Sequence, residues 1–116
     1  MNNKDSQASF NLRIVKEGLS SLAAKKEEQI NLNKAGMENL DNIFDVMIID
    51  YISYLEEKNI ISPETCSRIR NLYTEVELLT GGLADEEIEN YIRDDNTYLN
   101  SWRLRARDIL IEISSV

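Results

Sequence analysis

The sequence predicts an all-α protein, a bundle of four to five mostly antiparallel helices in a single domain. Apolar residues recur at steps of three and four along nearly the whole chain. The chain has one proline in 116 residues, and the breaks between apolar segments are short. A chain of this length normally makes one domain, which we place at residues 9–116 after a disordered tail at residues 1–8.

The first helix is predicted at about residues 9–32, where apolar residues from Leu12 to Ile30 fall on one stripe. Gly18 weakens this helix, and Asn33 and Gly36 favour an end or a kink after it.

The second helix is predicted at about residues 37–58 and carries the broadest apolar face of the chain. Asn59 suits a left-handed residue that stops a helix. A strand over residues 46–52 is the alternative, but the periodicity on both sides favours a helix.

The third helix begins at Ser62-Pro63-Glu64, because serine caps free amides, proline fits the first turn and glutamate complements the helix dipole. Gly81-Gly82 marks its end. Its apolar stripe consists of Cys66, Ile69, Leu72, Tyr73, Val76 and Leu79.

The run Asp85-Glu86-Glu87 opens a short fourth helix, and one of residues 94–96 caps a fifth. In the fifth helix a stripe from Leu99 to Ile113 recurs at steps of three and four. Trp102 lies on this stripe, so we expect it to anchor the core.

Three arginines of the fifth helix, Arg103, Arg105 and Arg107, alternate along the chain and cannot all share one face. We expect them to pair with the acidic helices or to line the solvent side.

The composition excludes several kinds of site. The chain has no histidine, which removes Ser-His-Asp and Cys-His catalysis, and its one cysteine, Cys66, cannot form an intrachain disulfide. We expect Cys66 to be a small buried hydrophobe, and we expect no cofactor. No secretion signal or membrane-spanning stretch is visible, so we expect a cytoplasmic location.

The acidic residues are concentrated in the middle of the chain. Residues 38–95 contain fifteen acidic and four basic residues, a net charge of −11, whereas residues 1–37 carry +2 and residues 96–116 carry +1. Such a field attracts cationic partners, and it disfavours direct binding to nucleic acid or to membrane surfaces.

Tyrosines are interleaved with these carboxylates, as in protein-binding surfaces aimed at a basic partner. The alternative is that the acids only keep a small protein soluble. The candidate partner-binding residues are Tyr54, Glu75, Glu77, Asp85, Glu86, Glu87, Glu89, Tyr91, Asp94, Asp95 and Tyr98.

We therefore predict a small acidic binding protein without catalytic activity that covers a basic protein partner. The physical character is that of an immunity or inhibitor protein of a bacterial nuclease-type toxin, which blocks a site evolved to attract phosphate.

A helical homo-oligomer with a structural or regulatory role is the first alternative. Some apolar residues miss the main stripes of their helices and could form a homodimer interface. These are Val46, Ile49, Leu104 and Ile111, and Leu78 is off its stripe as well.

A metal-dependent nucleotide pyrophosphatase is the second alternative. Glu86 and Glu89 resemble the first half of the Glu-x-x-Glu and Glu-x-x-Asp motif that holds magnesium in helical pyrophosphatases of the MazG type. The single Glu-x-x-Asp, Glu38 to Asp41, lies upstream, whereas the motif requires it downstream. We therefore predict no catalytic residue and no metal site.

Overall fold

The computed structural model describes residues 6–29, 48–94 and 97–115, and no strand occurs among them. The helices are α1 (Ser6–Ala23), α4 (Ile48–Glu57), α5 (Pro63–Thr80), α6 (Asp85–Arg93) and α7 (Thr97–Ile113). One more helical turn covers residues 26–29. The predicted all-α class is confirmed.

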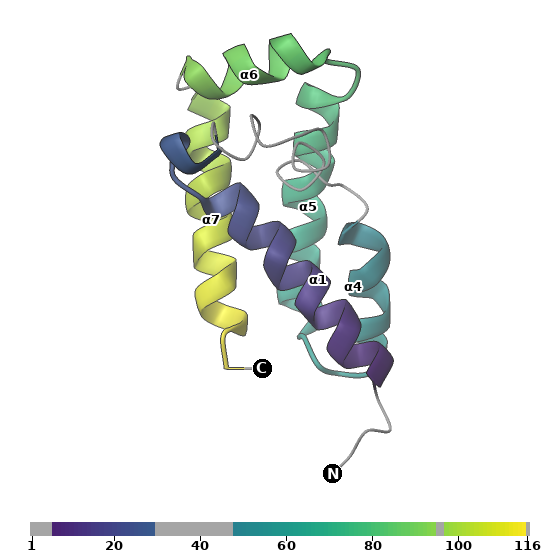
Figure 1. Cartoon of the computed structure of the whole chain (residues 1–116). Coiled ribbons are helices and arrows are strands. Elements are labelled where there is room, and N and C mark those ends of the chain that lie inside the picture. Colours follow the sequence, from purple (N-terminus) through teal and green to yellow (C-terminus); the bar gives the residue numbers. More distant parts are fainter. Residues whose placement is uncertain (1–5, 30–47, 95–96, 116) are drawn as a thin grey trace.

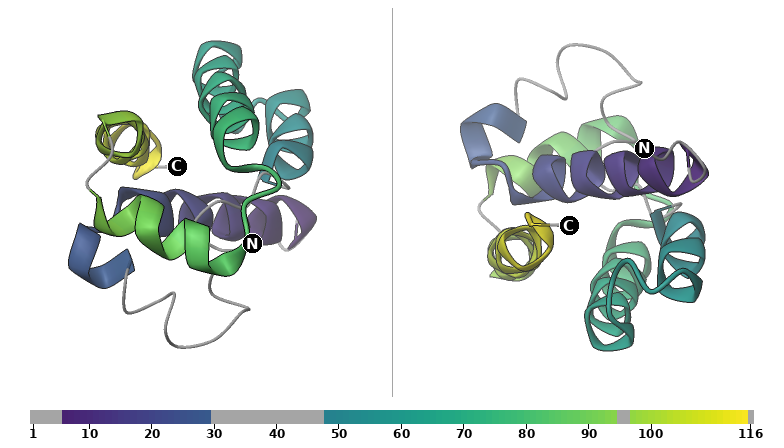
Figure 2. Two further views of the ribbon diagram at one scale, coloured as in Figure 1. Left: turned by 90° about the horizontal axis from the view of Figure 1, so that it is seen from above. Right: turned by 90° about the horizontal axis from the view of Figure 1, so that it is seen from below.

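The helices pack around α1, which lies against α4 and α7 and crosses in front of the α5–α7 pair (Figure 1). Helices α4 and α5 run antiparallel, as do α5 and α7. Helix α6 does not run along the bundle. It lies across the ends of α5 and α7, and the views from above and below show it on the same side of the bundle as α1 (Figure 2).

The core is a single cluster of apolar residues drawn from all five helices. Its largest fully buried side chains are Trp102 and Tyr73, so the prediction that Trp102 anchors the core is confirmed. Ile92 brings α6 into the same cluster. Burial of apolar side chains at roughly 25 cal/mol per Å² is the main favourable contribution to such a fold.

Helix α1 differs from the expected helix at residues 9–32. It begins at Ser6 and buries Ala8, so an ordered helix enters the expected tail. It ends at Ala23, and the chain bends at residues 24–25 before the next helical turn. Of the expected second helix, residues 48–58 lie within the described part of the chain, and residues 48–57 of these are helical.

Three of the predicted start and stop signals are confirmed, whereas Asn33, Gly36 and two of the candidate caps at 94–96 lie outside the described residues. Ser62 caps α5, with its Oγ accepting a hydrogen bond from the Thr65 backbone N–H at 3.2 Å. Asn59 stops α4 with a positive φ of 59°, and Gly82 follows α5 with a φ of 88°. Each signal acts within a few residues, and this is why it can be read from the sequence.

Gly18 lies where α1 packs closely against α4. A Cβ atom built on Gly18 would lie 2.7 Å from Cδ1 of Ile48, whose side chain is buried. Glycine therefore serves the packing of two helices here, although it lowers the helix propensity of α1.

The lower ends of α5 and α7 are joined through Glu112. Its carboxylate accepts hydrogen bonds from the Thr65 hydroxyl and from the Arg68 guanidinium. These two hydrogen bonds, that from Thr65 first, lower the pKa of Glu112 below the ordinary value of 4.5. The contact fixes the antiparallel register of α5 against α7.

Replacing Gly18 by a larger residue is expected to destabilise the protein. Gly18→Leu should lower the free energy of unfolding by about 1–3 kcal/mol in urea titrations, because the new side chain must displace buried Ile48. Ser20→Leu, at an exposed position of the same helix, should change it by less than about 0.5 kcal/mol. Equal stability of the two variants would contradict the close packing at Gly18.

Replacing Glu112 by glutamine should weaken the protein in a pH-dependent way. Because the pKa of Glu112 is lowered on folding, its stabilising effect is present above pH 4.5 and is lost as the pH falls through the folded-state value. Wild type should therefore exceed Glu112→Gln in unfolding free energy at pH 7, and the gap should close in acid. Glu57→Gln removes an exposed carboxylate and is the control. A gap independent of pH would contradict this role.

Candidate protein-binding surface

The turn between α5 and α6 sets the direction of the acidic helix. Gly82 adopts a left-handed backbone that a residue with a side chain would strain to reach. Oε1 of Glu87 then accepts a hydrogen bond from the Ala84 backbone N–H at 3.0 Å, closing the first turn of α6. The turn thereby brings residues 85–87 to the end of the bundle.

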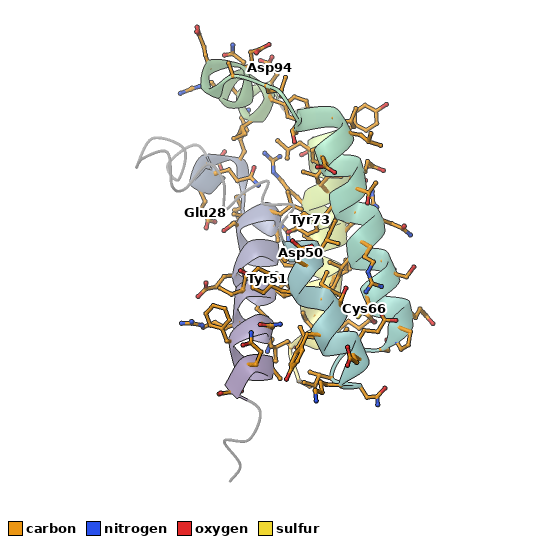
Figure 3. All side chains as sticks on the ribbon, turned by 90° about the vertical axis from the view of Figure 1, so that its right-hand side faces the viewer. Glu28, Asp50, Tyr51, Cys66, Tyr73 and Asp94 are labelled. Carbon is orange, nitrogen blue, oxygen red and sulfur yellow. The ribbon has the colours of Figure 1, made fainter. Side chains whose placement is uncertain are left out.

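This end of the molecule carries carboxylates with few bases among them. From residue 71 to residue 92 the chain has six acidic residues and no lysine or arginine. Glu77, Glu86, Glu87 and Asp94 are exposed to solvent. Asp94 lies at the α6 end, well away from Asp50 on α4 (Figure 3). We call this set of four exposed residues the acidic end.

Glu75 has a different role from the other predicted acids. Its Oε2 accepts hydrogen bonds from the indole Nε1–H of Trp102 and from Nη1 of Arg105, the latter at 3.0 Å. Both donors belong to α7, so Glu75 ties α5 to α7 beneath α6. Its charge is paired with that of Arg105 at the surface, where the two side chains are 37% and 38% exposed.

Two of the predicted tyrosines lie beside this tie. Tyr91 of α6 stacks on Trp102, with ring centroids 6.0 Å apart and ring planes at 23°. Its hydroxyl is buried and has no hydrogen-bond partner within the described part of the chain. Burial raises the pKa of Tyr91, with smaller contributions from Tyr98 and Glu75. Tyr98 lies close by and is 55% exposed.

The remaining predicted partner-binding residues do not all join this surface. Tyr54 lies on the last turns of α4, at the opposite end of the bundle, with Lys58 Nζ 5.5 Å from its ring centroid. Asp85 and Glu89 belong to α6, but their side chains lie outside the description, as does Asp95 altogether.

The arginines of α5 are paired within the bundle. Arg68 bonds to Glu112, and Arg70 Nη2 lies 2.7 Å from Oε1 of Glu56 on α4. Neither is directed at the acidic end. The ion pairs between described residues thus join α5 to α4 and to α7. Arg93, in the last turn of α6, is an exposed cation next to Asp94, whereas residues 71–92 carry six acidic residues and no lysine or arginine.

Two arginines of α7 hold the end of α1, which sequence reasoning did not foresee. Arg103 is buried, and its Nε and Nη2 donate to Oε1 of Gln29 at 3.0 and 2.8 Å. Gln29 in turn donates to the Leu22 carbonyl, and Arg107 donates to the Ala23 carbonyl at 3.1 Å. These contacts satisfy free carbonyls at the end of α1.

The expectation for the three α7 arginines is thus correct for Arg105, which pairs with Glu75 on α5. It is wrong for Arg103, which is buried and bonded to an amide. No local pattern marks Gln29 as its partner, because the two residues are 74 positions apart.

The off-stripe apolar residues divide into two groups. Ile49 is half-buried and packs against the core, so it is not a free oligomer contact. Leu78, Leu104 and Ile111 are 78%, 58% and 69% exposed. Val46 lies outside the described residues. Leu79, which its spacing assigns to the core stripe, is 38% exposed instead.

Among the side chains that the structure describes, which leave out those of Asp85 and Glu89, no three or more acidic or cysteine groups are arranged to hold a metal ion. None of the helices in these ranges has the length and apolar character needed to cross a bilayer. Cys66 is buried, as predicted, and burial raises the pKa of its thiol, which makes it a poor nucleophile at neutral pH.

No known protein family, curated protein or solved structure matches this chain.

Proposed function

We propose that this protein is a non-catalytic binding protein whose acidic end covers a basic surface of another protein. The observation that supports this most is the exposure of Glu77, Glu86 and Glu87 within residues 71–92, which contain no lysine or arginine, together with exposed Asp94 after Arg93. A local excess of negative charge of this kind accelerates encounter with a cationic surface and disfavours anionic competitors.

The partner that fits best is a protein that acts on nucleic acid. Its phosphate-attracting site is positively charged, and a rigid acidic surface can occupy that site in place of the nucleic acid. An immunity or inhibitor protein of a bacterial nuclease-type toxin has this function. The exposed apolar groups near the acidic end, Leu79 and Tyr98, supply contact area that charge alone does not provide.

Self-association is the second candidate, favoured by the exposure of Leu104 and Ile111 two turns apart on α7. Asp108 lies between them at helical spacing and is exposed. In a symmetric dimer formed on this strip, Asp108 would face its own copy, and like charges in contact oppose association. We therefore rank this candidate below the acidic end.

A charge-reversal experiment tests the proposal. The tagged protein is used to capture partners from extracts of its native cell, which are identified by mass spectrometry, and the association rate of each purified partner is then measured. Glu77→Lys with Glu86→Lys should slow association by about tenfold or more and remove most of its salt dependence.

Asp50→Lys with Glu57→Lys is the matched control. It also changes one exposed acid in a first helical turn and one exposed acid near a helix end, and it gives the same net charge. This pair should bind as wild type does after correction for the general loss of charge. Partners that are all acidic or neutral, or that bind both variants equally and regardless of salt, would refute the proposal.

A further inference from the structure

The antiparallel register of α5 and α7 places two exposed apolar residues at facing positions. Glu75 of α5 accepts a hydrogen bond from Trp102 of α7, so these positions face each other. One helical turn toward α6, the facing positions are Leu79 on α5 and Tyr98 on α7, because a turn advances both helices by about 5.4 Å. We call these two residues the Leu79–Tyr98 patch.

The patch rests on a rigid base. Beneath it lie buried Trp102 and the carboxylate of Glu75, and beside it Tyr91 stacks on Trp102. Tyr98 lies close enough to Tyr91 for the two hydroxyls to interact electrostatically. Aromatic groups supported in this way lose little conformational entropy when they bind a partner, which is a property of interface anchors.

The chemistry around the patch defines what it can receive. Glu77 and Asp94, both exposed, lie two and four residues along the chain from Leu79 and Tyr98. An anionic segment would be repelled, and an isolated cation would leave the apolar area uncovered. A segment that places an apolar side chain between arginines or lysines can pack against the Tyr98 ring and pair its cations with the carboxylates of Glu77 and Asp94.

We propose that the Leu79–Tyr98 patch is the anchor of the binding surface and that it receives an apolar side chain flanked by basic residues on an amphipathic segment of the partner protein. This inference rests on the proposed function of the acidic end and specifies which contact contributes most of its affinity. In this arrangement the carboxylates steer the partner and set the charge it must carry, whereas the patch determines how long it stays bound.

The test uses nuclear magnetic resonance on the full chain labelled with ¹⁵N. The probe is a blocked helical peptide with leucines flanked by arginines on an alanine background, together with a copy in which each leucine is alanine. Trp102 is the one tryptophan, so its indole N–H gives a single reporter signal at the base of the patch. The leucine peptide should shift this signal and the Leu79 and Tyr98 amides in a saturable manner.

Four variants separate the patch from its surroundings. Leu79→Ala and Tyr98→Ala should each lower the affinity for the leucine peptide by about tenfold. Tyr98→Phe, which keeps the aromatic ring, should bind the peptide nearly as wild type does. Leu104→Ala removes an exposed leucine elsewhere on α7 and should leave the affinity unchanged. The alanine peptide should bind wild type about tenfold more weakly than the leucine peptide.

The outcomes distinguish this inference from the proposed function. Suppose that Leu79→Ala and Tyr98→Ala bind the leucine peptide as wild type does, whereas the Glu77→Lys and Glu86→Lys pair binds it more weakly. This result would refute the role of the patch as an anchor and would still support the proposed function of the acidic end. Peptide-induced chemical-shift changes spread equally over Asp50, Glu57 and the acidic end, with no loss of affinity in any variant, would refute both the anchor and the proposed function. Amide spectra of each free variant establish that its fold is intact.

Discussion

Three arginines of α5 and α7 form ion pairs between helices, and the charge distribution of the molecule depends on this. Arg68 holds Glu112, Arg70 holds Glu56 and Arg105 holds Glu75, so each joins two helices. Exposed ion pairs of this kind contribute only modestly to stability, about 0–1 kcal/mol each. Their larger consequence is that these three cations are directed at Glu112, Glu56 and Glu75 and not at the four exposed carboxylates of the acidic end.

Helix α6 itself requires acids at its start. Negative side chains in a first turn complement the helix dipole, and Glu87 closes the turn by accepting a hydrogen bond from Ala84. Its carboxylates therefore stabilise the helix and at the same time charge the surface. The transverse position of α6 presents this turn at the end of the bundle, where a partner surface can reach it (Figure 1). The same carboxylates that stabilise the first turn of α6 thus supply the negative charge on which the proposed binding depends.

The features that could be predicted from the sequence are those whose causes lie within a few residues. The Ser62 cap, the stop at Asn59 and the left-handed Gly82 are local, and so is the stripe that buries Trp102. The contact of Gly18 with Ile48 and the bonds between Arg103 and Gln29 join distant segments, and no short-range pattern announces them. Leu79 shows the same limit, because its exposure depends on where α6 and α7 lie and its spacing within α5 gives no sign of it.

The sequence predicts which residue types form the candidate surface, but it predicts only in part which residues lie together on it. Glu77, Glu86, Glu87, Asp94 and Tyr98 are exposed at or beside one end, as a binding surface requires. Glu75 is turned inward by Trp102 and Arg105, and Tyr54 lies at the other end of the bundle. Sequence proximity groups residues by segment, whereas the helix directions decide which of them share a surface.

The most direct test of this charge segregation is a map of the electrostatic potential around the free protein. Paramagnetic relaxation of each amide is measured with a cationic and with an anionic nitroxide of the same size. The ratio of the two effects should be largest on α6 and on the adjoining turns of α5 and α7, and it should fall as salt is added. A ratio that is uniform over the surface, or that is largest along α4, would show that the carboxylates do not form a separate acidic end.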